Sequence, residues 1–239
     1  MHCKINVFLW FIMKKIVFLV IFFAAALFCT AQDADNQSKK TSGATYVKIE
    51  TSYGNMVVLL YNDTPLHRDN FINLVEKGYY DSLIFHRVIR DFMIQGGDPE
   101  SRNARPGQML GNGSPGYTVP AEFRANRFHK KGALAAARQG DDVNPQKASS
   151  GSQFYIVQGN VLDDRMLQMF TDRYGKTFTD EQREAYKTIG GTPHLDGEYT
   201  VFGEVVDGLE VIDKIAAAEC DRWNRPKTDI RMKMTILKR

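Results

Sequence analysis

The stretch FHRVIRDFMIQGGD, residues 85–98, combines a short apolar strand pattern with a glycine pair that starts a long loop. Its first five residues, Phe85–Ile89, predict a short strand, because aromatic and β-branched residues are enriched in strands. The residues that follow, from Gly96 to Pro120, carry glycine and proline without hydrophobic periodicity. We expect them to form a long irregular loop.

Short strands are also predicted on both sides of this segment. Strict alternation or short apolar runs predict them at Tyr46–Glu50, Met56–Tyr61, Gln153–Val157, Thr200–Val206 and Ile230–Leu237. The sequence Tyr53-Gly54-Asn55 supplies a turn, so the first two strands are expected to form a hairpin.

One helix early and one late are predicted in this strand-rich pattern, outside the insertion described below. Thr64-Pro65 is a helix start, with a hydroxyl N-cap and proline at the first helical position, and Gly78 is a stop signal. Leu209–Ala216 repeats apolar residues at helical spacing. Strands and helices do not alternate regularly, which disfavours a doubly wound parallel sheet and favours a mainly β barrel or sandwich.

Composition and charge limit the class of protein. The 239 residues are 43% hydrophobic and 25% charged, which excludes a disordered chain, a collagen-like fibre and a polytopic membrane protein. The net charge of +3 comes from three lysines in residues 1–31; the other basic and acidic residues balance at 28 each. A nucleic-acid partner is therefore not expected.

Residues 1–31 are expected to be a signal peptide. Lys14 and Lys15 precede the apolar run Ile16–Phe28, and small residues then suit cleavage before Gln32. The run is too short to span a bilayer, and Met13 is the expected start of translation. Residues 32–45 are expected to be a flexible polar linker, followed by one folded domain over residues 46–239.

The cysteines bear on the compartment and on metal binding. Cys29 is also a candidate site for a lipid, but Phe28 is larger than a lipidation motif prefers. We therefore expect a soluble exported protein located in the periplasm. Cys3 lies before the leader, and Cys220 is the one cysteine left in the folded region. Neither an internal disulfide nor a thiolate metal cluster is expected.

Other short motifs lack the context that their chemistry needs. Residues 111–116 fit G-x-G-x-x-G, but loop precedes them and Tyr117–Pro120 is a poor helix start, so nucleotide binding is not expected. The histidines show no metal-ligand spacing, and no serine lies in a Gly-x-Ser-x-Gly turn. No cofactor and no metal are expected.

Three segments together resemble the cyclophilin family of peptidyl-prolyl cis-trans isomerases. They are residues 85–98 quoted above, GSQFYI at residues 151–156 and LDGEYTVFG at residues 195–203. The resemblance extends from about Val47 to Leu237. It implies a closed eight-stranded antiparallel β-barrel capped by two α-helices, isomerase activity without a cofactor, and proline-containing polypeptides or unfolded proteins as partners. We expect the protein to be a monomer.

The chemistry of that reaction agrees with these residue types. An X–Pro bond rotates over a barrier of about 20 kcal/mol because twisting it breaks amide resonance. In the twisted state the prolyl nitrogen becomes pyramidal and gains a lone pair. A guanidinium group directed at that nitrogen binds the twisted state more strongly than the planar one, which is the requirement for catalysis.

The resemblance assigns site residues position by position. Arg87 matches the arginine that hydrogen-bonds the proline, and Gln95 matches the amide that orients this arginine. Ala137 and Arg138 match the strip along which the substrate lies extended. The apolar pocket for the proline ring is matched by Phe92, Met93, Tyr155 and Leu195. Arg87, Phe92 and Gln95 are taken as catalytic and the others as substrate-binding.

Three positions in the expected groove depart from the family. Tyr155 stands where phenylalanine is common, and its hydroxyl needs a partner. His194 replaces a frequent tryptophan, and Tyr199 replaces a frequent histidine. Because the arginine is kept, we expect activity to survive, with altered sequence preference and weaker inhibition by cyclosporin-type compounds.

Residues 160–193 form an insertion where the family usually has a short link. Leu162, Met166, Met169, Phe170 and Tyr174 fit one helix face, and Thr179 with Gln182 forms a capping box for a second helix that Gly190-Gly191 ends. Two interpretations remain open. The apolar residues either form a flap that holds large clients or pack on the barrel and on each other.

Three functions are compatible with these residues. The leading one is a prolyl isomerase that assists protein folding in the cell envelope. The second is a cyclophilin-like module or chaperone that binds proline-containing segments with little turnover. The third, a hydrolase using His86 and Asp98, lacks an activated nucleophile and ranks last.

Overall fold

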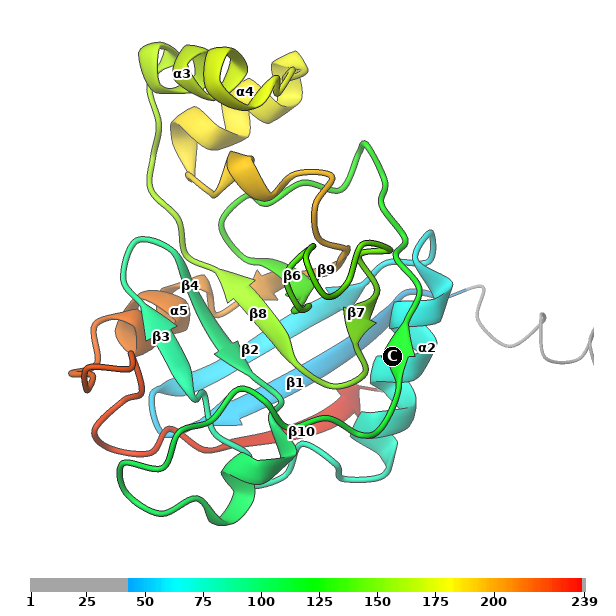
Figure 1. Ribbon diagram of the computed structural model, residues 1–239, viewed down its shortest axis with the longest axis vertical. Coiled ribbons are helices and arrows are strands. Elements are labelled where there is room, and N and C mark those ends of the chain that lie inside the picture. The colour runs from blue at the N-terminus through cyan, green and yellow to red at the C-terminus, as the bar shows by residue number, and fades with distance from the viewer. Residues whose placement is uncertain (1–42, 238–239) are drawn as a thin grey trace, which may run out of the picture. The chain divides into compact units, whose positions relative to one another are not determined.

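The computed structural model describes residues 43–237 (Figure 1). The expected signal peptide and nearly all of the expected linker, residues 1–42, lie outside the described residues. In the described part, Thr45 already belongs to the first strand. No helix within residues 43–237 has both the length and the apolar character needed to cross a membrane.

Ten strands, four α-helices and two short 3-10 helices make up the described part of the chain. The strands are β1 (Thr45–Thr51), β2 (Gly54–Leu60), β3 (Arg87–Ile89), β4 (Met93–Gly96), β5 (Thr118–Val119), β6 (Ala133–Ala136), β7 (Ser149–Ser150), β8 (Phe154–Val157), β9 (Val201–Asp207) and β10 (Met232–Leu237). The helices are α2 (Pro65–Glu76), α3 (Asp164–Tyr174), α4 (Asp180–Thr188), α5 (Leu209–Ala216), η1 (Pro99–Asn103) and η2 (Pro193–Leu195).

Eight strands form one antiparallel sheet in the order β10-β1-β2-β9-β6-β8-β4-β3, and β5 and β7 pair separately. The sheet is strongly curled, but the expected closed barrel is not confirmed, because β10 and β3 remain its two edges. β3 is only three residues long. The residues before β3 meet the other edge through backbone hydrogen bonds of Ser82, Leu83 and Phe85 with Ile230 and Met232.

Strand alternation divides the buried residues between the two faces of the sheet. Phe154 and Ile156 of β8 belong to the main core with Leu134 of β6, whereas Tyr155 and Val157 belong to a second cluster on the opposite face. This division follows from the two-residue period of a strand. The pocket described below is built on the face that carries Tyr155.

The two predicted helices, α2 and α5, close the main core. α2 contributes Phe71 and Leu74, and α5 contributes Ile212 and Ile215, all of them buried. Pro65 begins α2 as expected, but Thr64 makes no side-chain cap. Its hydroxyl instead lies 3.5 Å from the Tyr61 carbonyl oxygen, because Thr64 is buried beneath the helix start.

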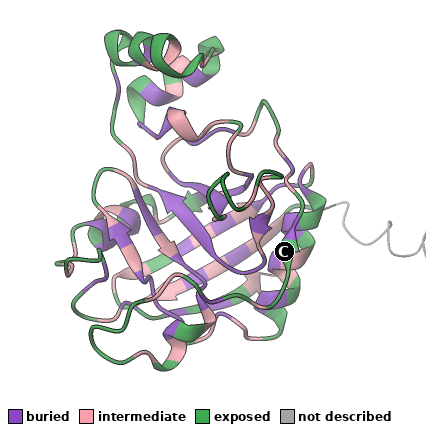
Figure 2. Cartoon of the chain, viewed as in Figure 1, coloured by how far each residue is buried: buried purple, intermediate pink, exposed green. Residues whose placement is uncertain are grey.

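The insertion forms two helices as expected, α3 and α4, but Leu162, expected on the first helix face, lies before α3 begins at Asp164. Thr179 and Gln182 make the predicted capping box at the start of α4. Leu162, Leu167 and Tyr186 are buried against Phe128 in a small third cluster. Figure 2 shows that most of the outer surface of these helices is exposed, so the packing interpretation holds for one side of the insertion only.

Candidate active site

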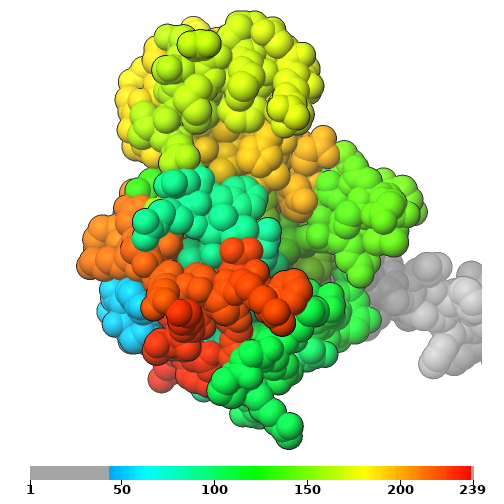
Figure 3. All heavy atoms as spheres, turned by 60° about the vertical axis from the view of Figure 1, so that its left-hand side comes forward, coloured from blue at the N-terminus to red at the C-terminus, as the bar shows by residue number. Residues whose placement is uncertain are grey.

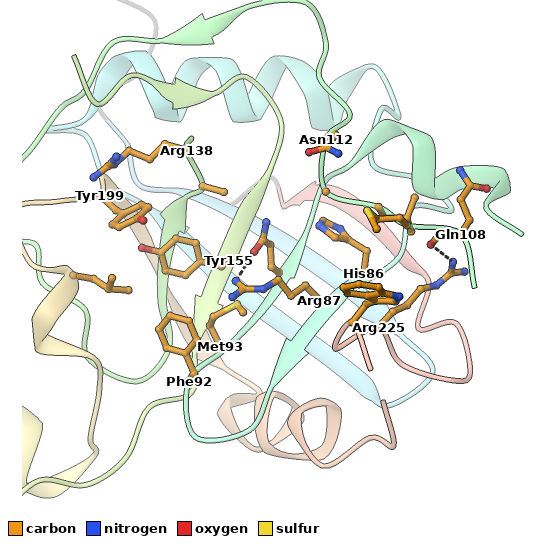
Figure 4. Close-up of a pocket in the computed structure, with 17 residues that line it drawn as sticks. His86, Arg87, Phe92, Met93, Gln108, Asn112, Arg138, Tyr155, Tyr199 and Arg225 are labelled. Atoms are coloured by element: carbon orange, nitrogen blue, oxygen red, sulfur yellow. Dashed lines mark hydrogen bonds between the residues drawn. The ribbon is translucent and has the colours of Figure 1, made fainter. Parts of the chain in front are cut away.

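A pocket of about 350 Å³ lies on the face of the sheet that carries Tyr155 (Figure 4). Strands β3, β4 and β8 form its floor, and segments outside the strands form its walls. The lining residues are His86, Arg87, Phe92, Met93, Gln95, Gln108, Met109, Leu110, Gly111, Asn112, Ala137, Arg138, Tyr155, Leu195, Tyr199, Trp223 and Arg225.

The strand register brings the central polar residues together. Arg87 lies directly opposite Gln95 in the β3–β4 pair, and Gln95 lies directly opposite Tyr155 in the β4–β8 pair. Residues that are directly opposite in neighbouring strands project from the same face of the sheet. Arg87, Gln95 and Tyr155 therefore form one row across three strands.

The position of Arg87 is held by two glutamines. An Nη1 hydrogen of Arg87 is donated to Gln95 Oε1 at 3.1 Å, and Gln95 Nε2 in turn donates to Gln153 Oε1 at 3.1 Å. Gln153 Nε2 donates to the carbonyl oxygens of Gly111 and Gly113 at 2.9 and 2.8 Å. The relay fixes the guanidinium while leaving its other N–H groups available.

Burial also affects the pKa of Arg87 and the strength of its electrostatic interactions. The Arg87 guanidinium is half-buried, and the loss of solvation lowers its pKa from the ordinary value, opposed by the nearby Tyr199. An arginine stays protonated at neutral pH in spite of such a shift. Arg87 thus presents a cation in surroundings where an electrostatic interaction is stronger than in water.

Apolar side chains lie at the other end of the row. Met93 and Tyr155 are buried, while Phe92 and Leu195 pack on them and are partly exposed. The guanidinium carbon of Arg87 lies 6.0 Å from the centre of the Phe92 ring. Figure 4 shows Phe92, Met93 and Tyr155 grouped on one side of Arg87, so a cation and an apolar slot adjoin each other.

The far wall of this slot is held by an arginine. The Arg138 guanidinium lies 4.5 Å from the centre of the Tyr199 ring, and its Nε donates to the Glu198 carbonyl oxygen at 2.8 Å. The Tyr199 ring meets the Tyr155 ring edge-on, with centroids 5.8 Å apart. Ala137 and Arg138 both line the pocket and directly follow β6 in the chain.

The Tyr155 hydroxyl has the buried partner that the sequence required. It lies 2.9 Å from Nε2 of His129, a residue with no solvent exposure. The backbone N–H and ring Nδ1 of His129 lie 2.8 and 2.9 Å from Asp196 Oδ1. The Tyr186 hydroxyl of α4 donates to Asp196 Oδ2 at 2.6 Å. The insertion is therefore tied to the pocket floor.

His194 alone among the ten expected site residues does not line the pocket. Its ring is stacked between two others, 5.8 Å from the Phe92 ring and 6.0 Å from the Phe170 ring of α3. The sequence resemblance placed His194 in the groove. Its side chain is instead taken up by the insertion, which the family pattern lacks.

The opposite half of the pocket was not expected from the sequence. His86, Arg225, Trp223 and the loop segment 108–112 line it. Arg225 Nη1 donates to the carbonyl oxygens of Arg105 and Gln108 at 2.9 and 3.1 Å, which joins two loops far apart in the chain. The Trp223 ring on this wall is exposed, and no sequence pattern gave a signal for it.

The glycine-rich motif at residues 111–116 begins in the wall of this pocket, where Gly111 and Asn112 line it. The Asp98 carboxylate, fully buried, accepts hydrogen bonds from the backbone N–H groups of Gly111 and Gly113. A Cβ atom on Gly113 would lie 2.0 Å from Asp98 Oδ1, so no larger residue fits there. The glycines therefore allow close approach of the backbone to Asp98, and they leave carbonyl groups free to hold Gln153.

His86 is buried beside Arg87, and neither of its ring nitrogens has a hydrogen-bond partner in the described part of the chain. Burial lowers the pKa of His86 to about 4, although Asp98 acts to raise it. The imidazole is therefore neutral at pH 7. His86 and Asp98 share no hydrogen bond, and the pocket-lining residues among the described ones include no serine, threonine or cysteine, which argues against the hydrolase interpretation.

His86 is expected to make stability fall in acid. Its pKa of about 4 in the folded protein is below the 6.5 of an unfolded chain, so the unfolded state binds the proton first as pH falls. Stability is lost between pH 6.5 and 4, by up to about 3 kcal/mol. Urea unfolding of the wild type and of His86→Gln across this pH range measures the contribution of His86. If the free energy of unfolding changes with pH in the same way in both proteins, the prediction is wrong.

Comparison with known proteins agrees with this geometry. Residues 46–236 match the family model described as cyclophilin type peptidyl-prolyl cis-trans isomerase. A Staphylococcus aureus protein named as a peptidyl-prolyl cis-trans isomerase is 37% identical over 190 residues, 79% of this chain and 89% of that protein. A Streptococcus pyogenes protein named as a bifunctional phosphatase/peptidyl-prolyl cis-trans isomerase is 38% identical over 187 residues, 77% of this chain. The match spans only 37% of the streptococcal protein.

Solved structures give the same result. A cyclophilin type peptidyl-prolyl cis-trans isomerase from Cryptosporidium parvum superposes with a TM-score of 0.59 and 26% identity, covering 82% of this chain and 99% of that one. A second structure from that organism, determined in the presence of the dipeptide Ala-Pro, gives a TM-score of 0.57 and 25% identity, covering 81% and 99%. The likeness thus includes nearly the whole of each parasite chain.

Proposed function

Because this chain belongs to the cyclophilin-type peptidyl-prolyl cis-trans isomerase family, we propose that its pocket binds an extended X–Pro segment and that Arg87 is the catalytic group. The observation that carries the proposal is the row Arg87–Gln95–Tyr155 beside an apolar slot. It sets a fixed cation next to an apolar slot that suits a proline ring.

The slot accounts for recognition of proline. Phe92, Met93, Tyr155 and Leu195 offer apolar surface to a ring that has no hydrogen-bond donor. Ala137 and Arg138 lie at the end of β6, where the backbone of an extended substrate can run alongside. Binding the ring firmly allows the other side of the bond to rotate while the proline stays in place.

Arg87 accounts for the faster rotation about the X–Pro bond. Rotation removes the resonance of the amide and leaves a lone pair on the prolyl nitrogen, and an N–H of the guanidinium donates to it. This bond is strong only in the twisted state, so it lowers the barrier without tightening the ground state. Gln95 and Gln153 hold the guanidinium in advance, so little reorganisation is needed during the reaction.

The activity is tested with an Ala-Pro tetrapeptide by NMR exchange spectroscopy or a protease-coupled assay. Uncatalysed exchange takes about 10–100 s. The purified protein at micromolar concentration is expected to shorten this severalfold or more. Equal exchange rates with and without the protein would instead favour the second reading, a module that binds proline-containing segments with little turnover.

We propose further that the isomerase is exported, acts as a monomer and assists protein folding in the cell envelope. Support comes from the sequence of residues 1–31, which has the charge and apolar pattern of a signal peptide. N-terminal sequencing of the exported protein is expected to begin at Gln32. An intact Met1 on exported protein would contradict the cleavage, and an acyl mass on Cys29 would favour a lipid anchor.

A further inference from the structure

One face of α3 presents apolar side chains to solvent. Met166, Phe170 and Tyr174 recur every four residues and Met169 lies three residues after Met166, which places all four on the same side of the helix. Met166, Met169 and Tyr174 are 38%, 47% and 49% exposed, and Phe170 is half-buried. We call these four residues the α3 strip. Adjacent exposed apolar residues mark interaction surfaces more often than single ones do.

The α3 strip is continuous with the pocket through stacked rings. Phe92, which lines the pocket, stacks on His194 at 5.8 Å, and His194 stacks on Phe170 at 6.0 Å. Phe170 then stacks on Tyr174, also at 5.8 Å. An unbroken series of rings therefore leads from the wall of the pocket to exposed surface on the insertion.

The insertion that carries this strip is anchored to the rest of the domain. Leu167 of α3 and Tyr186 of α4 are fully buried, and Tyr186 donates to Asp196. Lys176, just after α3, donates to the Asp196 carbonyl oxygen. In Figure 3 the insertion, in yellow, lies directly over the segment that carries β3 and β4. The strip is thus held in place near the pocket and does not depend on closure of a flap.

We propose that the α3 strip binds apolar residues of the same polypeptide whose X–Pro bond occupies the pocket, at positions beyond the reach of a tetrapeptide. The inference rests on the proposed function of the pocket. The client chain is the occupant that continuity favours, because it already lies at Phe92. Methionine adapts its shape to varied apolar partners, which suits clients of differing sequence.

The test compares a short and a long substrate. In the variant Met166→Ser/Met169→Ser/Tyr174→Ser, turnover of the Ala-Pro tetrapeptide is expected to stay within about twofold of wild type, since these side chains do not line the pocket. Catalysis of a proline-limited refolding reaction is expected to fall about tenfold in kcat/KM, because apolar contact area is lost. Leu66→Ser/Val206→Ser removes apolar residues of similar exposure from other elements and is the matched control.

A binding measurement separates this inference from the function on which it rests. The affinity for a reduced, carboxymethylated protein that stays unfolded is expected to fall about tenfold in the α3 variant and not in the control. If the tetrapeptide is not turned over by wild type but this difference is seen, the catalytic proposal fails and the strip stands.

Three results would overturn the proposal. The first is equal refolding catalysis and equal client affinity in the α3 variant and wild type. The second is an equal loss on tetrapeptide and protein, which would mean that the substitutions act through the pocket. The third is a wild-type dimer in sedimentation velocity that the α3 variant dissociates, since the occupant would then be a second copy of the chain.

Discussion

Replacing Arg87 with alanine is expected to lower kcat/KM on an Ala-Pro tetrapeptide by about 100- to 1,000-fold, the usual effect of removing a donor that acts on developing charge. The loss should fall on kcat more than on KM, because the bond to the prolyl nitrogen forms only as the amide twists. The assay is NMR exchange at several peptide concentrations, which separates the two constants.

Two further variants make this result specific. Arg87→Lys keeps the charge but loses the planar fork that Gln95 holds, so it should recover little of the activity. Arg90→Ala removes an exposed arginine from the same hairpin and should have no measurable effect. A loss below about tenfold in Arg87→Ala would exclude this donor as the main source of catalysis.

Replacing Asp196 with alanine is expected to lower the free energy of unfolding by about 3–5 kcal/mol. The carboxylate accepts hydrogen bonds from the backbone and ring of His129 and from the Tyr186 hydroxyl. All three donors are buried, and each costs about 1–3 kcal/mol when left without an acceptor. Urea unfolding with an unchanged m-value measures the loss.

A graded series tests whether the network is the cause. Tyr186→Phe removes one donor and keeps the other two satisfied, so it should cost only about 1 kcal/mol. Asp207→Ala removes an exposed carboxylate and should leave the unfolding midpoint in place. Equal midpoints for Asp196→Ala and Asp207→Ala would show that the buried donors find other partners.

Much of the fold follows from local sequence. The period of two along β8 correctly separates Phe154 and Ile156 from Tyr155, and the capping residues of α4 mark its start. Closure of the barrel could not be predicted in this way. It depends on how many hydrogen bonds join β10 to the residues before β3, and that is set by the curvature of the whole sheet.

The candidate site shows the same division. The residues on β3, β4 and β8 could be assigned from segments of sequence, because the strand register alone brings them together. His129 and Arg225 carry no local signal. Each is placed by contacts with residues far along the chain, Asp196 and Gln108 among them. His194 does not line the pocket because its ring stacks on Phe170, and this contact depends on the fold of the insertion.

Trp223 on the pocket rim gives this protein a built-in optical reporter. The sequence has two tryptophans, and the other is Trp10, within the expected leader. A chain that starts at Gln32 therefore emits tryptophan fluorescence from position 223 alone. Because this indole is 52% exposed at the pocket edge, a bound peptide that displaces water from it shifts the emission to shorter wavelength. Titrations of unlabelled ligands can then be followed directly in a fluorimeter.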